Sequence, residues 1–139
     1  MASEIKVNKF TGVTTAGSIL VTGEGNSTTT NLQQGLAKVW CNFNGTTGAS
    51  NDTLNVASMT DNGTGNHTIN ISNDFSNALY SATTTGSEGN TNDNVVILST
   101  SASGFSAGSI TVFIFADDSG IFDPTNNEPM CATIHGDLA

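Results

Sequence analysis

Carboxylates are densest in the stretch FADDSGIFDPTNNEP, where Asp117, Asp118, Asp123 and Glu128 lie within a dozen residues of one another. Carboxylate and amide oxygens on a loop can hold Ca²⁺, so a cation loop is one interpretation. The other is a solvated connection between two strands, in which Asp and Pro supply the turn geometry. We favour the connection and predict no metal ion here.

A second candidate cation loop is SMTDNGTGNHTINIS, residues 58–72. A calcium loop of the EF-hand kind needs oxygen ligands at fixed spacing, a late bidentate Glu and a helix on either side. Here Asp61 is the only carboxylate, and Ile69 and Ile71 alternate with polar residues as in a strand. The Asn62–Gly63 pair between alternating runs is typical of a β-hairpin, because both residue types tolerate positive φ. The sequence therefore predicts a hairpin.

Other residue types give little indication of catalysis. His67 and His135 have no His, Cys or carboxylate partner at a spacing typical of zinc sites, and no Ser stands in a nucleophile elbow. Cys41 and Cys131 are expected to be buried thiols, although their pairing stays open. Asp and Glu occur in many loops, which keeps a glycan depolymerase with a carboxylate pair as an alternative. We predict a protein that is not an enzyme and takes no cofactor.

The charge pattern excludes two classes of partner. The net charge is -9, and the only basic side chains besides histidine are three lysines. Binding to nucleic acid or to an anionic membrane surface needs a basic footprint, which this chain does not have. No apolar run reaches the roughly 18 residues of a membrane span, and the opening MASEIKVNKF lacks the apolar centre of a signal peptide. We expect neither nucleic-acid binding nor membrane insertion.

The composition predicts short strands and many turns. Thr, Asn, Ser and Gly make up about half of the chain, and no window carries a sustained apolar stripe of helical period. Thr and Val favour strands, whereas Gly, Asn and Ser favour turns. Short strands separated by such turns are typical of an antiparallel sandwich or barrel. We predict an all-β fold, with a jelly-roll-like antiparallel β-sandwich over residues 34–139.

Two strands of this domain are expected to be covered on both faces. In QGLAKVWCNFNG one face is apolar throughout, and the other carries Leu36 and Trp40. In SITVFIFAD, Val and Ile side chains oppose Phe side chains, as in a central strand. Trp40 and Tyr80 could stack on a sugar ring, but core packing is the favoured interpretation for both.

The first 33 residues form a separate segment in this interpretation. EIKVNKF and SILVTG alternate apolar and polar residues and are predicted to form a short β-ribbon. A two-stranded ribbon is marginal alone, so it needs something to pack against. The partner is either further copies of the chain or the surface of a larger assembly, and the predicted self-association or attachment residues are Ile5, Val7, Ile19 and Val21.

A resemblance to a known group of proteins rests on three runs of sequence. QQGLAKVWCNFNGT, LNVASMTDNGTGNHTINIS and NALYSAT resemble a module of virion structural proteins of tailed bacteriophages, notably marine ones. The matching positions are Ala37, Lys38 and residues 40–46, 61–65, 68–71 and 77–81, and the opening SEIKVNKFTGVTTAGSI resembles the leader of that module. Cys41 and His67 depart from the pattern. The resemblance covers roughly residues 1–80, and beyond them only the strand-and-turn style and an ending like IHGDLA are similar.

This resemblance implies a virion component, tail-fibre-like and homotrimeric, in contact with other tail or capsid proteins. Host adhesion through a surface glycan or protein is the leading hypothesis, with residues 86–94 and 117–128 as receptor-facing loops. A capsid decoration or head-spike protein is the closest alternative, and the depolymerase is a third. The candidate receptor-facing residues are Glu88, Asn90, Asp93, Asp117, Asp118 and Asp123.

Overall fold

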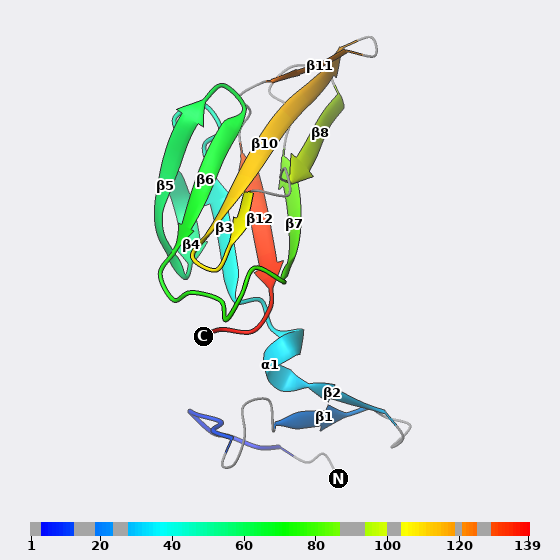
Figure 1. The fold of residues 1–139 in the computed structure, drawn as a ribbon. Coiled ribbons are helices and arrows are strands. Elements are labelled where there is room, and N and C mark those ends of the chain that lie inside the picture. The colour runs from blue at the N-terminus through cyan, green and yellow to red at the C-terminus, as the bar shows by residue number, and fades with distance from the viewer. Residues whose placement is uncertain are drawn as a thin grey trace. The chain divides into compact units, whose positions relative to one another are not determined.

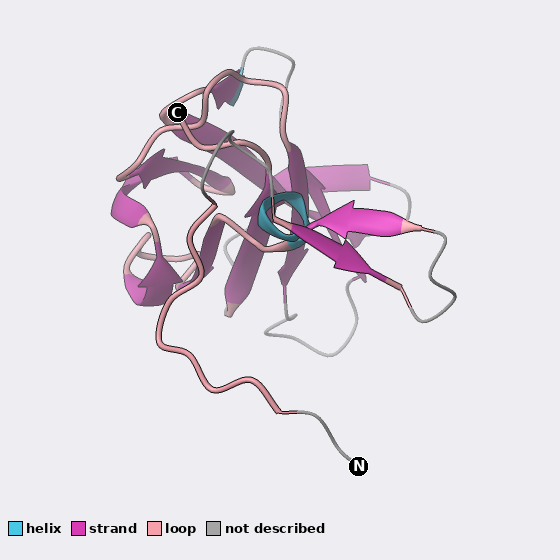
Figure 2. Ribbon diagram, turned by 90° about the horizontal axis from the view of Figure 1, so that it is seen from below, coloured by secondary structure: helices cyan, strands magenta, loops and turns pink. Residues whose placement is uncertain are grey.

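The computed structural model describes residues 4–12, 19–23, 28–86, 94–99, 104–118, 121–124 and 129–139, with the side chains of 94–99, 116–118 and 121–124 excepted. The chain divides into two compact units, residues 1–36 and 37–139. The boundary predicted after residue 33 falls inside the short helix α1 (Leu32–Gly35). Among the described residues α1 is the only α-helix, and strands dominate the rest (Figure 2).

The first unit contains a small antiparallel hairpin, β1 (Leu20–Thr22) with β2 (Thr29–Asn31). The Asn31 side chain caps α1 by accepting hydrogen bonds from the backbone N–H groups of Gln33 and Gln34 at 2.8 and 3.3 Å. The predicted strand in EIKVNKF is wrong, because residues 4–12 contain no strand. The partner of β1 is instead the TTN of β2, in a stretch that sequence reasoning treated as low complexity.

In the second unit, one sheet has the order β4-β3-β12-β7 and is called the β3 sheet. Its strands, all antiparallel neighbours, are β3 (Val39–Phe43), β4 (Ser50–Leu54), β7 (Ser81–Gly86) and β12 (Met130–His135). In β3 and β12 buried and half-buried residues alternate strictly, because successive side chains of a strand point to opposite faces. Leu36, predicted to lie in the first strand, is exposed and precedes it.

The other sheet, called the β10 sheet, has the order β11-β10-β6-β5, with β8 and β9 also paired to β10. Its strands are β5 (Val56–Gly63), β6 (Asn66–Ile71), β8 (Asn94–Ser99), β9 (Phe105–Ser106), β10 (Ser109–Asp118) and β11 (Ile121–Pro124). As predicted, β10 is a central strand, but the prediction that both of its faces are buried is wrong. Its Val112 and Ile114 are fully buried, whereas Phe113 and Phe115 on its other face are only half-buried.

The chain passes from one sheet to the other at Asn55, the single residue between β4 and β5. Asn55 has a positive φ of 58°, a conformation that asparagine tolerates better than most residues. Its side chain accepts a hydrogen bond from the Asn73 backbone N–H at 2.8 Å and donates one to the Asn73 carbonyl at 3.1 Å. This pair fixes the corner where the two sheets meet.

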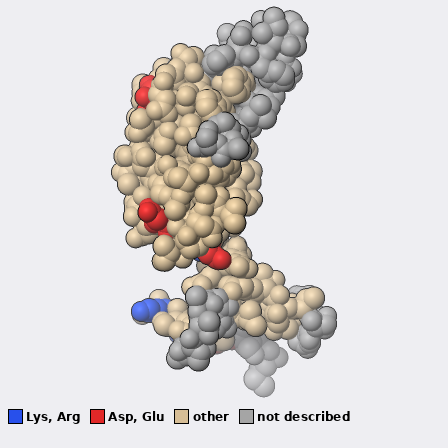
Figure 3. Space-filling model, viewed as in Figure 1, with Lys and Arg blue, Asp and Glu red and all other residues tan. Residues whose placement is uncertain are grey.

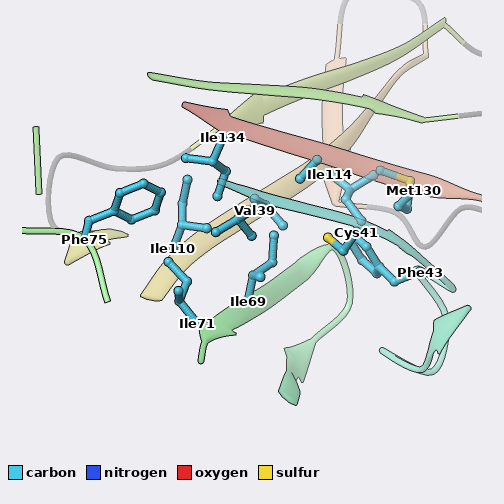
Figure 4. Close-up of a cluster of buried hydrophobic side chains, with 12 residues drawn as sticks. Val39, Cys41, Phe43, Ile69, Ile71, Phe75, Ile110, Ile114, Met130 and Ile134 are labelled. Atoms are coloured by element: carbon cyan, nitrogen blue, oxygen red, sulfur yellow. The ribbon is translucent and has the colours of Figure 1, made fainter. Parts of the chain in front are cut away.

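The core lies between the two stacked sheets (Figures 1 and 4). Buried side chains from β3 and β12 meet those of β6 and β10, and Phe75 closes the cluster from the segment before β7. Among the described residues, the buried apolar side chains are Val39, Cys41, Phe43, Ile69, Ile71, Phe75, Ile110, Val112, Ile114, Met130, Ala132 and Ile134. The predicted all-β, antiparallel sandwich is confirmed.

Candidate functional site

Large apolar side chains are exposed on the first unit. Ile5, Val7 and Val21 have exposed fractions of 78%, 52% and 51%. Ile19 is half-buried, and its carbonyl accepts a hydrogen bond from the Leu32 N–H at 2.8 Å. Sequence reasoning missed three further exposed apolar residues of this unit, Phe10, Leu20 and Leu36.

The first unit has no core of its own among its described residues. Between residues 4 and 36 no described side chain is fully buried, and all three residues of β1 are exposed. Exposed apolar residues scattered singly are ordinary on a protein surface, but a short ribbon with no buried residue is marginal in water. This unit therefore needs a further apolar surface to become stably ordered.

The candidate receptor-facing residues fall into two groups. Glu88, Asn90 and Asp93 lie outside the described residues. Asp117 and Asp118 end β10 and Asp123 lies in β11, and the backbone register pairs Asp117 with Phe122 and Asp118 with Ile121. The predicted loop over residues 117–128 is therefore wrong in its first part, because a β-hairpin replaces it.

The predicted hairpin over residues 58–72 is confirmed, since β5 and β6 pair in antiparallel register. Its two-residue loop is Thr64–Gly65, and Gly63 and Gly65 both have positive φ, 123° and 66°. Asn62 stands at a register shift, and its amide donates to Thr68 Oγ1 at 2.8 Å. Asp61 accepts a hydrogen bond from the Gly63 backbone N–H at 2.9 Å. These polar groups hold the turn.

His67 lies in the interior, a position that was not predicted from the sequence. Its side chain is fully buried, with the ring edge-to-face against Phe43 at a centroid distance of 5.5 Å. Nε2 is 2.8 Å from the Gly45 carbonyl oxygen, and since a carbonyl only accepts, Nε2 must carry the proton. Nδ1 has no hydrogen-bond partner and lies 3.9 Å from Asp61 Oδ1. His67 thus ties the turn after β3 to β6 and meets no described nucleophile.

The cysteines do not form a disulfide. Cys41 points into the core, and Cys131 is half-buried on the opposite face of the β3 sheet, where Asn42 donates a hydrogen bond to its Sγ at 3.4 Å.

Burial raises the pKa of the Cys41 thiol from 9.0 to about 11. Below pH 9 the neutral buried thiol contributes fully to stability. That contribution is lost as pH rises toward about 11, because the unfolded thiol ionises first.

The folded protein should present one fast-reacting thiol to a chromogenic disulfide reagent at pH 8. Cys131 is expected to react at least about tenfold faster than Cys41, whose thiol is both buried and protonated. The variant Cys131→Ser should lose the fast phase, and denaturant should release the slow one. Two equally fast thiols in the folded wild-type protein would contradict the burial of Cys41.

Charged groups are sparse and stand apart on the face shown in Figure 3. Within the described ranges no three His, Cys, Asp or Glu side chains gather closely enough to hold a metal ion. The described helix is also too short to cross a membrane.

The two aromatic residues considered for stacking have different environments. Tyr80 packs against the core as predicted, stacked on Phe75 at 4.6 Å, and its hydroxyl donates to backbone carbonyls of Ser106 and Ser109. Trp40 is not in the core. It is half-buried on the outer face of β3, between the inward-pointing Val39 and Cys41. The prediction that this strand is covered on both faces is therefore wrong.

A comparison of the chain with protein-family models, curated proteins and solved structures finds no match.

Proposed function

We propose that the chain is a non-enzymatic structural protein of a bacteriophage virion. In this proposal, the β-sandwich unit is an adhesive head, and residues 1–36 associate with the same segment of two further copies. The observation that carries the proposal is the contrast between the units. Among the described residues, the second unit has twelve buried apolar side chains, whereas the first unit has none and exposes most of its apolar side chains.

Self-association provides what the first unit lacks. Apolar side chains removed from water contribute about 25 cal/mol per Å² of buried area. Identical segments around a closed symmetry axis bury such side chains against one another without leaving an open edge. Attachment to a different virion protein would use the same side chains. The number of three copies follows from the resemblance of the sequence to tail-fibre-like proteins.

The second unit has surface properties that suit an adhesive head. Its outward-facing strand residues are mostly Thr, Ser and Asn, and charged groups are scarce on the face shown in Figure 3. A polar surface of this kind presents many short hydrogen-bonding groups to a partner. The proposal involves no catalytic step.

Adsorption of the phage to its host tests the adhesive role. Purified full-length protein, incubated with host cells before infection, is expected to slow adsorption severalfold as it occupies the receptor. Bovine serum albumin at the same concentration serves as the control. If saturating protein leaves the adsorption rate unchanged, the adhesive role is rejected. Labelling of the chain on the capsid in images of intact particles would then establish head decoration instead.

A further inference from the structure

The outer face of the β3 sheet has a chemical character different from the rest of the unit. Its central residue is Trp40 on β3, with neighbours contributed by all four strands (Figure 1). We call this surface the Trp40 face and define it by Trp40, Asn42, Leu54, Thr83, Thr133 and His135. Each of these side chains is half-buried or exposed.

The strand register sets four of these residues in one row. Trp40 pairs with Leu54 of β4 on one side and with Thr133 of β12 on the other, and Thr133 pairs in turn with Thr83 of β7. Four neighbouring strands span about 14 Å between the outer two. The row is therefore a shallow strip with one large aromatic ring and short side chains on both sides of it.

Hydrogen bonding on this face contrasts with that on the outer face of the β10 sheet. There, polar side chains satisfy one another: Asn62 donates to Thr68 at 2.8 Å, the Thr68 and Thr111 hydroxyls are 3.0 Å apart, and Asn70 donates to Thr60 at 3.0 Å. On the Trp40 face the side chains of Trp40, Thr83, Thr133 and His135 make no hydrogen bond to any described residue. Their donors and acceptors are open to a ligand.

The composition of the Trp40 face selects among possible occupants. None of its six side chains carries a fixed charge, and Asp52, the exposed cross-strand neighbour of Asn42, places one carboxylate beside them, which disfavours an anionic ligand. Only Trp40 and Leu54 are apolar, whereas the interfaces of permanent homodimers are dominated by apolar area. An aromatic ring flanked by hydroxyl, amide and imidazole groups suits a ligand that has both C–H faces and hydroxyl groups. Neutral sugars combine these two features.

We propose that the Trp40 face binds a neutral carbohydrate. One sugar ring lies on the indole of Trp40, and Thr83, Thr133 and His135 exchange hydrogen bonds with its hydroxyl groups. This inference rests on the proposed adhesive function and names its ligand class. It also places ligand recognition on the flat face of a sheet, whereas the sequence favoured the acidic segments, residues 86–94 and 117–128.

The chain offers a direct probe, because Trp40 is its only tryptophan. Full-length protein is titrated to about 10 mM with maltohexaose, cellohexaose, laminarihexaose and chitotetraose, a range that reaches millimolar dissociation constants. At least one sugar is expected to change the intensity or the wavelength of tryptophan emission in a saturable way. No saturable change with any of the four overturns the inference.

Variants locate the binding. For the sugar that responds, calorimetry should show affinity at least about tenfold weaker in Trp40→Leu, equivalent to about 1.4 kcal/mol. Phe113→Leu is the matched control, because Phe113 is also half-buried on an outer sheet face but belongs to the β10 sheet; it should bind like the wild type. Thr133→Val keeps the side-chain size and removes the hydroxyl, which keeps the test decisive if Trp40→Leu fails to fold. The inference is overturned if Trp40→Leu and Thr133→Val both bind the sugar with wild-type affinity. If Trp40→Leu does not fold, wild-type affinity in Thr133→Val alone overturns it.

Two further measurements distinguish a failure of the proposed sugar site from a failure of the proposed adhesive function. If wild-type protein and Trp40→Leu block phage adsorption equally well, adhesion stands and the Trp40 face is not its site. If the sugar titration succeeds but wild-type protein does not block adsorption, the sugar site stands and the adhesive role fails. A change of oligomeric state in Trp40→Leu, measured by sedimentation, would instead identify a second copy of the chain as the occupant.

Discussion

Replacing Phe75 by alanine is expected to lower the free energy of unfolding by about 3–5 kcal/mol. Phe75 has an exposed fraction of 2%, its ring stacks on Tyr80 at 4.6 Å, and its backbone N–H donates to the Ala107 carbonyl at 2.9 Å. It also lies against Gly136, where an added Cβ would come within 3.0 Å of the Phe75 ring. Because its surroundings come from distant parts of the chain, they cannot easily collapse into the space that alanine leaves.

Urea denaturation followed by circular dichroism measures this loss. The matched control is Leu79→Ala, four residues further along, where the side chain has an exposed fraction of 89%. Its free energy of unfolding should stay within about 0.5 kcal/mol of the wild type. Similar losses in the two variants would show that Phe75 does not close the core.

Introducing aspartate at Val7 and Val21 together should convert the assembled protein into monomers. Both side chains are about half exposed on the first unit, and in the proposed trimer they become buried against other copies. Each buried unpaired carboxylate would cost several kcal/mol, and the symmetry repeats that cost in every subunit. Sedimentation velocity should show one slow species for the double variant and a trimer for the wild type. The circular dichroism of the sandwich should be unchanged, because its core contains neither residue.

Added charge alone must be separated from the loss of apolar contact. The double variant Asn8→Asp and Thr29→Asp adds the same charge in the same segment, at polar exposed positions; Thr29 is adjacent to Thr30, the cross-strand neighbour of Val21, and therefore points to the opposite face of the ribbon from Val21. This control should remain trimeric. A monomeric wild-type protein, or trimers that survive aspartate at Val7 and Val21, would refute the proposed role of the first unit.

The strands of the sandwich could be predicted because their alternation is strong. β3, β6 and β12 each alternate buried with half-buried residues, and the turn-forming residues around Asn62 marked the β5–β6 hairpin. The alternation of residues along β3 was insufficient to predict that Trp40 lies on the outer face of the strand. When both faces of a strand carry apolar residues, the period of the pattern does not say which face meets the second sheet.

The remaining predictions failed where the structure depends on contacts between residues far apart in the chain. Ile5 and Val7 alternate as in a strand, yet residues 4–12 form none, while the polar TTN pairs with β1. The burial of His67 was not predicted, because its acceptor, the Gly45 carbonyl, lies 22 positions earlier in the chain. For the candidate site, the sequence indicated a polar, acidic surface on loops, and only the register across neighbouring strands brings Trp40, Thr133 and Thr83 into one row.

The central position of β12 has a consequence for the order of folding. β12 pairs with β3, with Met130 opposite Phe43 and Ile134 opposite Val39. One edge of β3 therefore has no partner strand until β12 has been translated, much later in synthesis. During synthesis the β5–β6 hairpin can form from residues that are close in the chain, while the edge of β3 that pairs with β12 stays exposed. Closure of the β3 sheet is therefore a late event, and we expect the nascent chain to bind chaperones that recognise exposed apolar strands until β12 leaves the ribosome.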